Sequence, residues 1–254
     1  MIAIALSLAL LSVVILASPF SPFTSTRVET TITFTEKGLI ISGGTLSYSD
    51  VLSHYQKNKI LLIDKEGKYR ISGILDNSQI QVDWSDSGEN NTDKPIEIIL
   101  DNVLITGATA PVIKLNRDAV ITLAEESINE IRAGNNNAIY STGSIIFQGE
   151  GKDNGKLIIN TEKSGIQSSA DLTFESGTYM INASQNSISA SNNIYINGGN
   201  IIAGGMDEEL SNIESRQHFM QFLFQPEKTA GSAITILESQ GNDILTFDLT
   251  GKYK

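Results

Sequence analysis

Three consecutive segments decide the fold of this sequence: AIYSTGSIIFQGEGKDNGKLIINT (residues 138–161), GIQSSADLTFESGTYMINAS (165–184) and SISASNNIYINGGNIIAGG (187–205). Apolar residues recur at matching places in all three segments. The leading columns are Ile139, Ile166 and Ile188, then Ile145, Leu172 and Ile194, then Phe147, Phe174 and Ile196. The trailing columns are Gly155, Gly177 and Gly199, then Leu157, Tyr179 and Ile201, then Ile159, Ile181 and Ala203.

The spacing of these columns defines one repeating unit. The second and third segments are 22 residues apart at every column, and so is the glycine column of the first two segments. The leading columns of the first two segments are 27 apart, so five extra residues lie between Phe147 and Gly155. A 22-residue unit is too short for a βαβ unit or a propeller blade. It predicts an all-β protein, a single-stranded right-handed parallel β-helix of the pectin-lyase-like kind, with a β-sandwich as the alternative.

The alternation of residues assigns each side chain to the inside or the outside of a coil. With period 2, the column residues point inward and stack, while the residues between them point outward. The outward set comprises Ile146, Thr173 and Tyr195, and Ile158, Met180 and Ile202. The column glycines suit a corner that needs positive φ or close backbone approach. We also expect Asn192, Asn193 and residues 135–137 to occupy left-handed corners and to form amide ladders.

The rest of the chain divides around this repeat. Upstream alternation extends the predicted β-helix domain over residues 24–205, with the acidic stretch 83–93 as an inserted loop. Residues 206–254 contain strand-like segments and predict a small C-terminal cap, which we expect to be truncated. The open ends of a coil are exposed strand edges that such caps cover.

The N-terminus predicts export. The run from Ile2 to Ala17 is apolar and uncharged and is followed by Pro19 and Pro22. Its length is close to the roughly 7–15 residues of a signal-peptide core and short of the roughly 20 of a membrane span. We expect residues 1–23 to be a signal peptide, with an uncleaved anchor or a buried helix as alternatives. The predicted location is extracellular or at the cell surface, with membrane contact only through such an anchor.

The amino-acid composition argues against some classes of binding partner. The chain has 18 Lys+Arg, 29 Asp+Glu and no cysteine, and its formal net charge is -11. This charge argues against nucleic acid, whose phosphates attract basic surfaces. The absence of cysteine excludes disulfides and thiolate metal sites.

Residues 67–205 resemble a bacterial family of carbohydrate-binding domain-containing proteins. The resemblance rests on ordered segments: GKYRISGILDNSQIQVD, IEIILDNVLITGATAPVIKL, DAVITLAEESINEI, the repeats above, and GGNIIAGG. The tail phrase AGSAITILESQGNDILTF is also similar. The resemblance implies a parallel β-helix that binds polysaccharides such as polygalacturonate and cellulose, with calcium implicated.

The residues at the family's calcium-type turns differ in this chain. An Asp-Asp-Gly-Ile or Asn-Asp-Gly-Ile turn is usual there, but this sequence reads Asn136-Asn137-Ala138-Ile139 and Lys163-Ser164-Gly165-Ile166. Calcium needs several carboxylate or carbonyl oxygens at one point. We therefore expect no metal site and no cofactor, and calcium at Asp83, Asp86, Glu89 and Asp93 remains an alternative.

No arrangement of catalytic residues is evident. The clustered carboxylates, Gly-His-Gly turn and Arg-Ile-Lys strand of polygalacturonases do not occur, and His54 and His218 lie outside the repeats. Lys114 and Arg117 are interpreted as solvated charges rather than as the base of a lyase. We therefore predict a non-catalytic protein, with a lyase or hydrolase as the least favoured alternative.

Three aromatic residues are the predicted ligand contacts. Sugar rings stack on exposed aromatic side chains, and polar groups bind their hydroxyls. Trp84 leads the acidic loop, and Tyr140 and Tyr195 have outward parity, so that they could line one wall. The structural alternative is that these side chains cover the coil edge or pack against the tail. The predicted function is polysaccharide binding along an elongated face, and the alternative is a structural or adhesive surface module.

Overall fold

The repeat columns stack as parallel strands, one coil above the next. In the computed structural model, Ile139 pairs with Ile166 and Ile166 with Ile188. The other inward columns are likewise in register, from Ile145, Leu172 and Ile194 to Ile159, Ile181 and Ala203. The structure describes residues 28–44, 46–83, 95–107, 111–206 and 212–218, and the backbone of 233–237 and 243–248. The coil is a parallel β-helix of about five turns.

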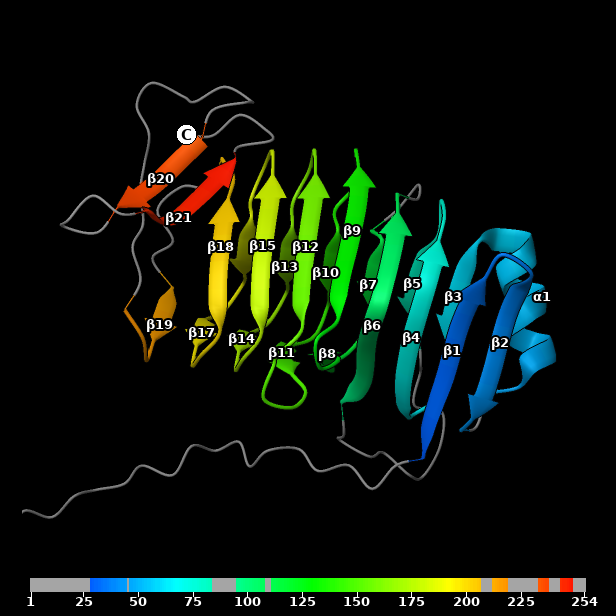
Figure 1. Ribbon diagram of the computed structural model, residues 1–254. Helices are drawn as coiled ribbons and strands as arrows, with labels where there is room; N and C mark the ends of the chain where they lie inside the picture. Colours follow the sequence, from blue (N-terminus) through cyan, green and yellow to red (C-terminus); the bar gives the residue numbers. More distant parts are fainter. Residues whose placement is uncertain are drawn as a thin grey trace, which may run out of the picture.

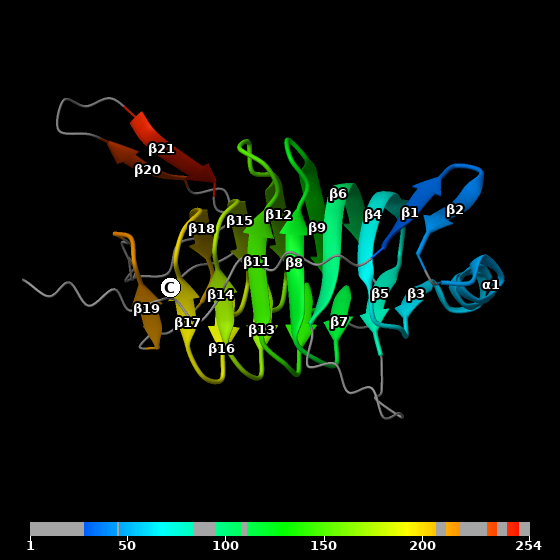
Figure 2. The ribbon, with the colours of Figure 1, turned by 90° about the horizontal axis from the view of Figure 1, so that it is seen from below.

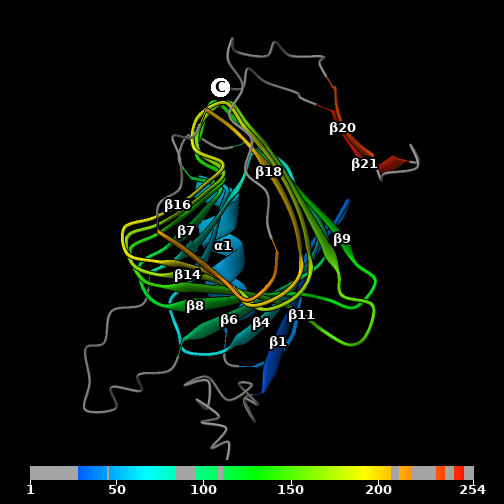
Figure 3. The ribbon, with the colours of Figure 1, turned by 90° about the vertical axis from the view of Figure 1, so that its left-hand side faces the viewer.

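Three walls surround the core (Figures 1 and 3). Wall A contains β1 (Glu29–Thr35), β2 (Gly38–Gly43), the first halves of β4 (Lys68–Leu75) and β6 (Ile96–Thr106), β8 (Ala119–Leu123), β11 (Ile145–Gly149), β14 (Leu172–Phe174), β17 (Ile194–Ile196) and β19 (Ile213–Ser215). Wall B contains the second halves of β4 and β6, with β9 (Ile128–Gly134), β12 (Lys156–Thr161), β15 (Thr178–Ala183) and β18 (Asn200–Gly204). Wall C contains β3 (Ile60–Ile63), β5 (Gln79–Val82), β7 (Ile113–Leu115), β10 (Ile139–Ser141), β13 (Ile166–Ser168) and β16 (Ile188–Ala190). Viewed down the axis in Figure 3, the chain turns counter-clockwise as it approaches the viewer, which makes the coil right-handed.

The corner between walls A and B needs left-handed backbone. Gly73 has φ +92°, and a Cβ atom there would lie 2.0 Å from the carbonyl oxygen of Phe34. Gly177 and Gly199 also have positive φ, as the glycine column predicts, whereas Gly155 is required by a close approach to the Ala124 oxygen. The expectation of left-handed asparagines at 135–137, 192 and 193 is wrong: among the described residues, left-handed asparagines occur at 77 and 102. Asn137 nevertheless donates a 3.3 Å amide–amide hydrogen bond to Gln167 Oε1 in the next coil.

The core is apolar and contains an aromatic stack. The rings of Phe147 and Phe174 are stacked at 5.2 Å, and Tyr179 meets both edge-on. The Tyr179 hydroxyl donates a hydrogen bond of 2.6 Å to the Ser176 carbonyl oxygen, so the buried phenol has a partner. Burial raises the pKa of Tyr179.

The two ends of the coil differ. At the N-terminal end lie the β1–β2 hairpin and α1 (Tyr48–Asn58), and α1 places Val51 and Tyr55 against the core (Figure 2). The opening strand therefore starts the coil, pairing in parallel with β4, and a helix that the sequence did not suggest covers its base. At the other end, β20 (Ala233–Leu237) and β21 (Asp243–Asp248) form an antiparallel pair, which confirms strands in the C-terminal segment.

Several expectations lie outside the described residues. They concern the signal peptide or anchor at 1–23, Trp84, and the acidic loop beyond Asp83. Within the described ranges, no helix combines the length and the apolar character that a membrane crossing requires.

Candidate functional site

The predicted aromatic contacts lie on different walls. Tyr140 is half-exposed on wall C, in register with Lys114 and Gln167, and its hydroxyl is 3.4 Å from Ser169 Oγ. Tyr195 is half-exposed on wall A, where its hydroxyl accepts a 3.0 Å hydrogen bond from Asn193 Nδ2. The outward parity of both tyrosines is confirmed, but they do not line one wall.

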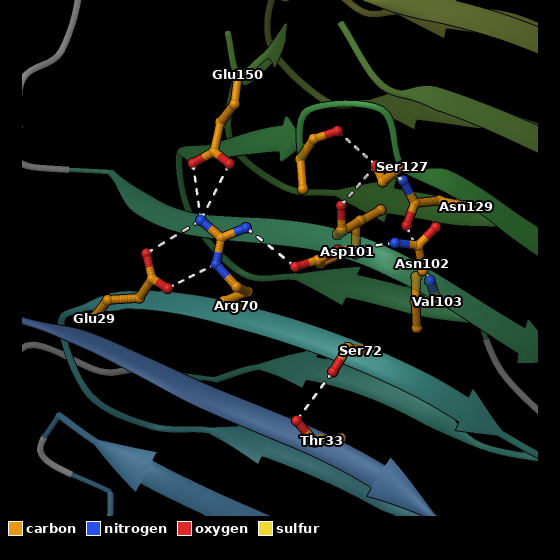
Figure 4. Close-up of polar contacts among 12 residues, drawn as sticks. Glu29, Thr33, Arg70, Ser72, Asp101, Asn102, Val103, Ser127, Asn129 and Glu150 are labelled. Carbon is orange, nitrogen blue, oxygen red and sulfur yellow. Dashed lines mark hydrogen bonds and ion pairs between the residues drawn. The ribbon is translucent and has the colours of Figure 1, made fainter. Parts of the chain in front are cut away.

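Wall A carries charged residues that pair with one another. Arg70 on β4 donates hydrogen bonds to Glu29 on β1 at 2.7 Å, to Asp101 on β6 at 3.3 Å and to Glu150 after β11 at 3.1 Å. Figure 4 shows the guanidinium of Arg70 between the three carboxylates, and we call these four residues the Arg70 cluster. Partial burial lowers the pKa of Arg70, but its hydrogen bonds to Glu29 and Glu150 outweigh this effect, and the net shift is upward.

A second polar chain crosses wall A beside the Arg70 cluster. Lys68 Nζ lies 3.2 Å from Glu97 Oε1, Thr122 donates to the same oxygen, and Gln148 donates to Thr122. These four residues come from four adjacent strands and form a continuous line. The Lys68 ammonium, the Glu97 carboxylate and the Thr122 hydroxyl thus have partners within the protein, so this part of wall A offers few donors or acceptors to a ligand.

Wall B instead has a hollow that is open to solvent. Its volume is about 480 Å³, within the usual range for ligand sites, and it lies at the ends of β9, β12 and β15. The lining residues are Arg132, Gly134, Asn160, Thr161, Glu162, Ala183 and Ser184. A Cβ atom at Gly134 would have no neighbour within 4 Å, which agrees with open space at this point.

The register aligns the polar side chains of the hollow. Arg132 and Asn160 line the hollow and occupy one row across β9 and β12, which the buried Asn182 continues on β15. Asn182 Nδ2 donates a hydrogen bond to Asn160 Oδ1 at 3.2 Å. This is an amide ladder of the predicted kind, but it lies on wall B and not at residues 135–137, 192 or 193. Since adjacent strands are about 4.8 Å apart, the row from Thr106 on β6 to Gly204 on β18 spans roughly 19 Å.

Arg132 remains accessible although it is paired. Its Nε and one terminal nitrogen donate to Glu130 at 2.6 and 2.9 Å, and its side chain is 59% exposed. The hydrogen bond to Glu130 raises the pKa of Arg132. A guanidinium has five N–H donors, so this pairing leaves further donors directed to solvent.

Half-buried aliphatic residues border the hollow. Ile158 and Met180 occupy the next outward row of β12 and β15, in register with each other and with Ile202 on β18. The site thus combines a short apolar strip with planar amide, carboxylate and guanidinium groups. Such a combination suits a ligand with C–H faces and many hydroxyl groups.

The described residues contain no cluster of three or more histidine, cysteine, aspartate or glutamate side chains arranged to hold a metal ion. Asp83 accepts hydrogen bonds from Gln81 and Asn116.

The fold defines a class of protein, the parallel β-helix, and one of its walls carries an open hollow. A family profile, described as carbohydrate-binding domain-containing protein, matches residues 57–219, well over half of the chain. The chain belongs to this carbohydrate-binding domain-containing family. Searches of curated proteins and of solved structures found no match.

Proposed function

We propose that this chain binds a polysaccharide without cleaving it, and that the chain of sugars lies along the hollow of wall B. The observation that carries this proposal is the aligned pair of Arg132 and Asn160 in the hollow, beside the strip of Ile158 and Met180. Family membership supports carbohydrate as the ligand. The apolar run from Ile2 to Ala17 supports a place outside the cell or at its surface.

Of the two ligand types that the resemblance implies, the charges of the hollow favour the neutral one. The carboxylate of Glu130 neutralises the positive charge of Arg132, and Glu162 adds a further carboxylate to the lining of the hollow. The chain as a whole has a formal net charge of -11, which repels a polyanion. A cellulose-like glucan therefore fits the site better than polygalacturonate.

Affinity electrophoresis tests this proposal. The full chain is run through native gels that contain a soluble β-glucan or polygalacturonate, with calcium or with a chelator. We expect retardation by the glucan only, equal in both buffers. The double variant Arg132→Ala/Asn160→Ala is expected to weaken glucan binding at least about tenfold, because each lost hydrogen bond to a ligand contributes about 1 kcal/mol.

Two tyrosine variants are the matched controls. Tyr195→Ala and Tyr140→Ala alter half-exposed residues on walls A and C and should leave retardation unchanged. Loss of binding in Tyr140→Ala, with full binding in the double variant, would move the site to wall C. Released reducing ends in the same incubations would contradict a non-catalytic role.

A further inference from the structure

One strand edge at the N-terminal end lies open. The 13-stranded sheet ends on β2, which pairs only with β1, whereas the six-stranded sheet ends on β3; α1 packs more extensively against β3 than against β2. Figures 1 and 2 show β2 as the last strand of its sheet, with α1 behind it. Among the residues that the structure describes, α1 thus covers the edge of β3, and β2 has no strand partner on the side away from β1.

The open edge lacks the usual protection against strand pairing. Natural edge strands carry lysine, proline or a bulge, because a row of free backbone groups recruits other strands. The β2 sequence, GLIISG, has no charge and no proline, and its pairing with β1 is unbroken over six residues. The uncharged stretch continues to Ser49 in a chain with a formal net charge of -11. Two such chains can therefore approach each other here without opposing like charges.

The side chains of β2 are compatible with a two-fold arrangement. Leu39 is buried in the core, and Ile41 packs partly against it, whereas Ile40 points outward and is 57% exposed. An antiparallel pairing that sets Ile40 opposite Ile40 of a second copy also sets Leu39 opposite Ile41. Apolar residues then meet apolar residues on both faces of the joined sheet.

We propose that β2 pairs antiparallel with β2 of a second copy, so that two β-helices join end to end through one continuous sheet. This contact is isologous and closes as a dimer, which leaves no free edge at the join. If the hollow of wall B binds glycan as proposed, the dimer carries two such sites on one rigid body and gains avidity.

Light scattering after gel filtration tests the dimer with the full chain. We expect the wild type to have the mass of two chains, and Ile40→Lys to have the mass of one. Ile74→Lys is the matched control, because Ile74 is also an outward isoleucine, 63% exposed, but lies on the wall B half of β4, where it pairs with Leu104 of β6 and not with β1 or β2. This control should keep the dimer mass. Circular dichroism establishes that both variants are folded.

Hydrogen exchange provides a second measurement at the strand itself. The amides on the free side of β2, every second residue of 38–43, should gain protection as the wild-type concentration rises, and should not do so in Ile40→Lys. A wild type that stays monomeric would overturn the proposal. So would a dimer that survives Ile40→Lys, since this result would place the contact elsewhere. Neither result bears on glycan retardation, which a monomer can also show.

Discussion

Walls A and B are built from the same coils, yet their outer surfaces differ in what their polar groups do. On wall A, Arg70 is 23% exposed and is surrounded by three carboxylates from distant parts of the chain. On wall B, Arg132 is 59% exposed, pairs with one carboxylate two residues away, and lines a hollow. The first arrangement holds strands together, and the second leaves donors for a ligand. A cluster of charge alone therefore does not identify a binding surface.

The largest expected effect comes from removing the cation of wall A. Arg70→Met leaves Glu29, Asp101 and Glu150 facing one another without their shared partner. We expect the free energy of unfolding to fall by about 3 kcal/mol, at the low end for broken buried pairs because the cluster is partly exposed. Urea titration measures this loss. Glucan retardation of the folded variant should be unchanged.

Arg132→Met is the matched control for this prediction. Its ion pair is exposed, so its removal should leave the urea midpoint where it is and weaken glucan binding. If Arg132→Met destabilised the protein as much as Arg70→Met, the distinction between the two walls would be lost.

A smaller effect is expected from the polar chain beside the Arg70 cluster. Thr122→Val keeps the shape of a residue that is 1% exposed but removes the hydroxyl that links Gln148 to Glu97. We expect a loss of about 1 kcal/mol in the free energy of unfolding. Thr178→Val on wall B, where the threonine is half-buried, should change it by less than about 0.5 kcal/mol. Equal losses in both variants would show that wall A has no special role.

The smallest expected effect is that of salt. Raising NaCl from about 0.1 to about 1 M shortens the screening length from roughly 10 to 3 Å and weakens the partly exposed pairs of Arg70. We expect the wild type to lose a few tenths of a kcal/mol relative to Arg70→Met across this range. Glucan retardation should not respond, because hydrogen bonds to a neutral ligand are not screened. Salt-sensitive retardation would instead indicate an anionic glycan.

The repeat predicted the interior of the coil more fully than its surface. Ile166, Leu172 and their partners stack as predicted because a 22-residue period with alternating apolar residues permits few other registers. Asn160 and Asn182 are also 22 residues apart, so their ladder was visible in the alignment. The place of Arg132 was not, because its coil has no constant offset to the next one: Ala119 pairs with Ile145, 26 residues on, whereas Arg132 pairs with Asn160, 28 residues on.

The local sequence signals of helix α1 are too weak to predict it. Ser47 stands at its N-cap and Asp50 in its first turn, and Val51, Leu52 and Tyr55 face the core. Eleven residues in a mostly polar stretch give little periodicity by themselves. The helix is explained by the tertiary structure, because its apolar residues cover the core at the N-terminal end of the coil.

By itself, the sequence determined the stacking of the coils, since side chains repeated at a fixed period must superimpose when strands pair in register. Only the tertiary structure decided which polar residues meet. Arg70 and Glu150 are 80 positions apart and come together because coils lie side by side, whereas Tyr140 and Tyr195 have the same parity and yet lie on separate walls. Parity distinguishes inward from outward side chains, but it does not identify the wall. The wall depends on the corner at which each strand begins.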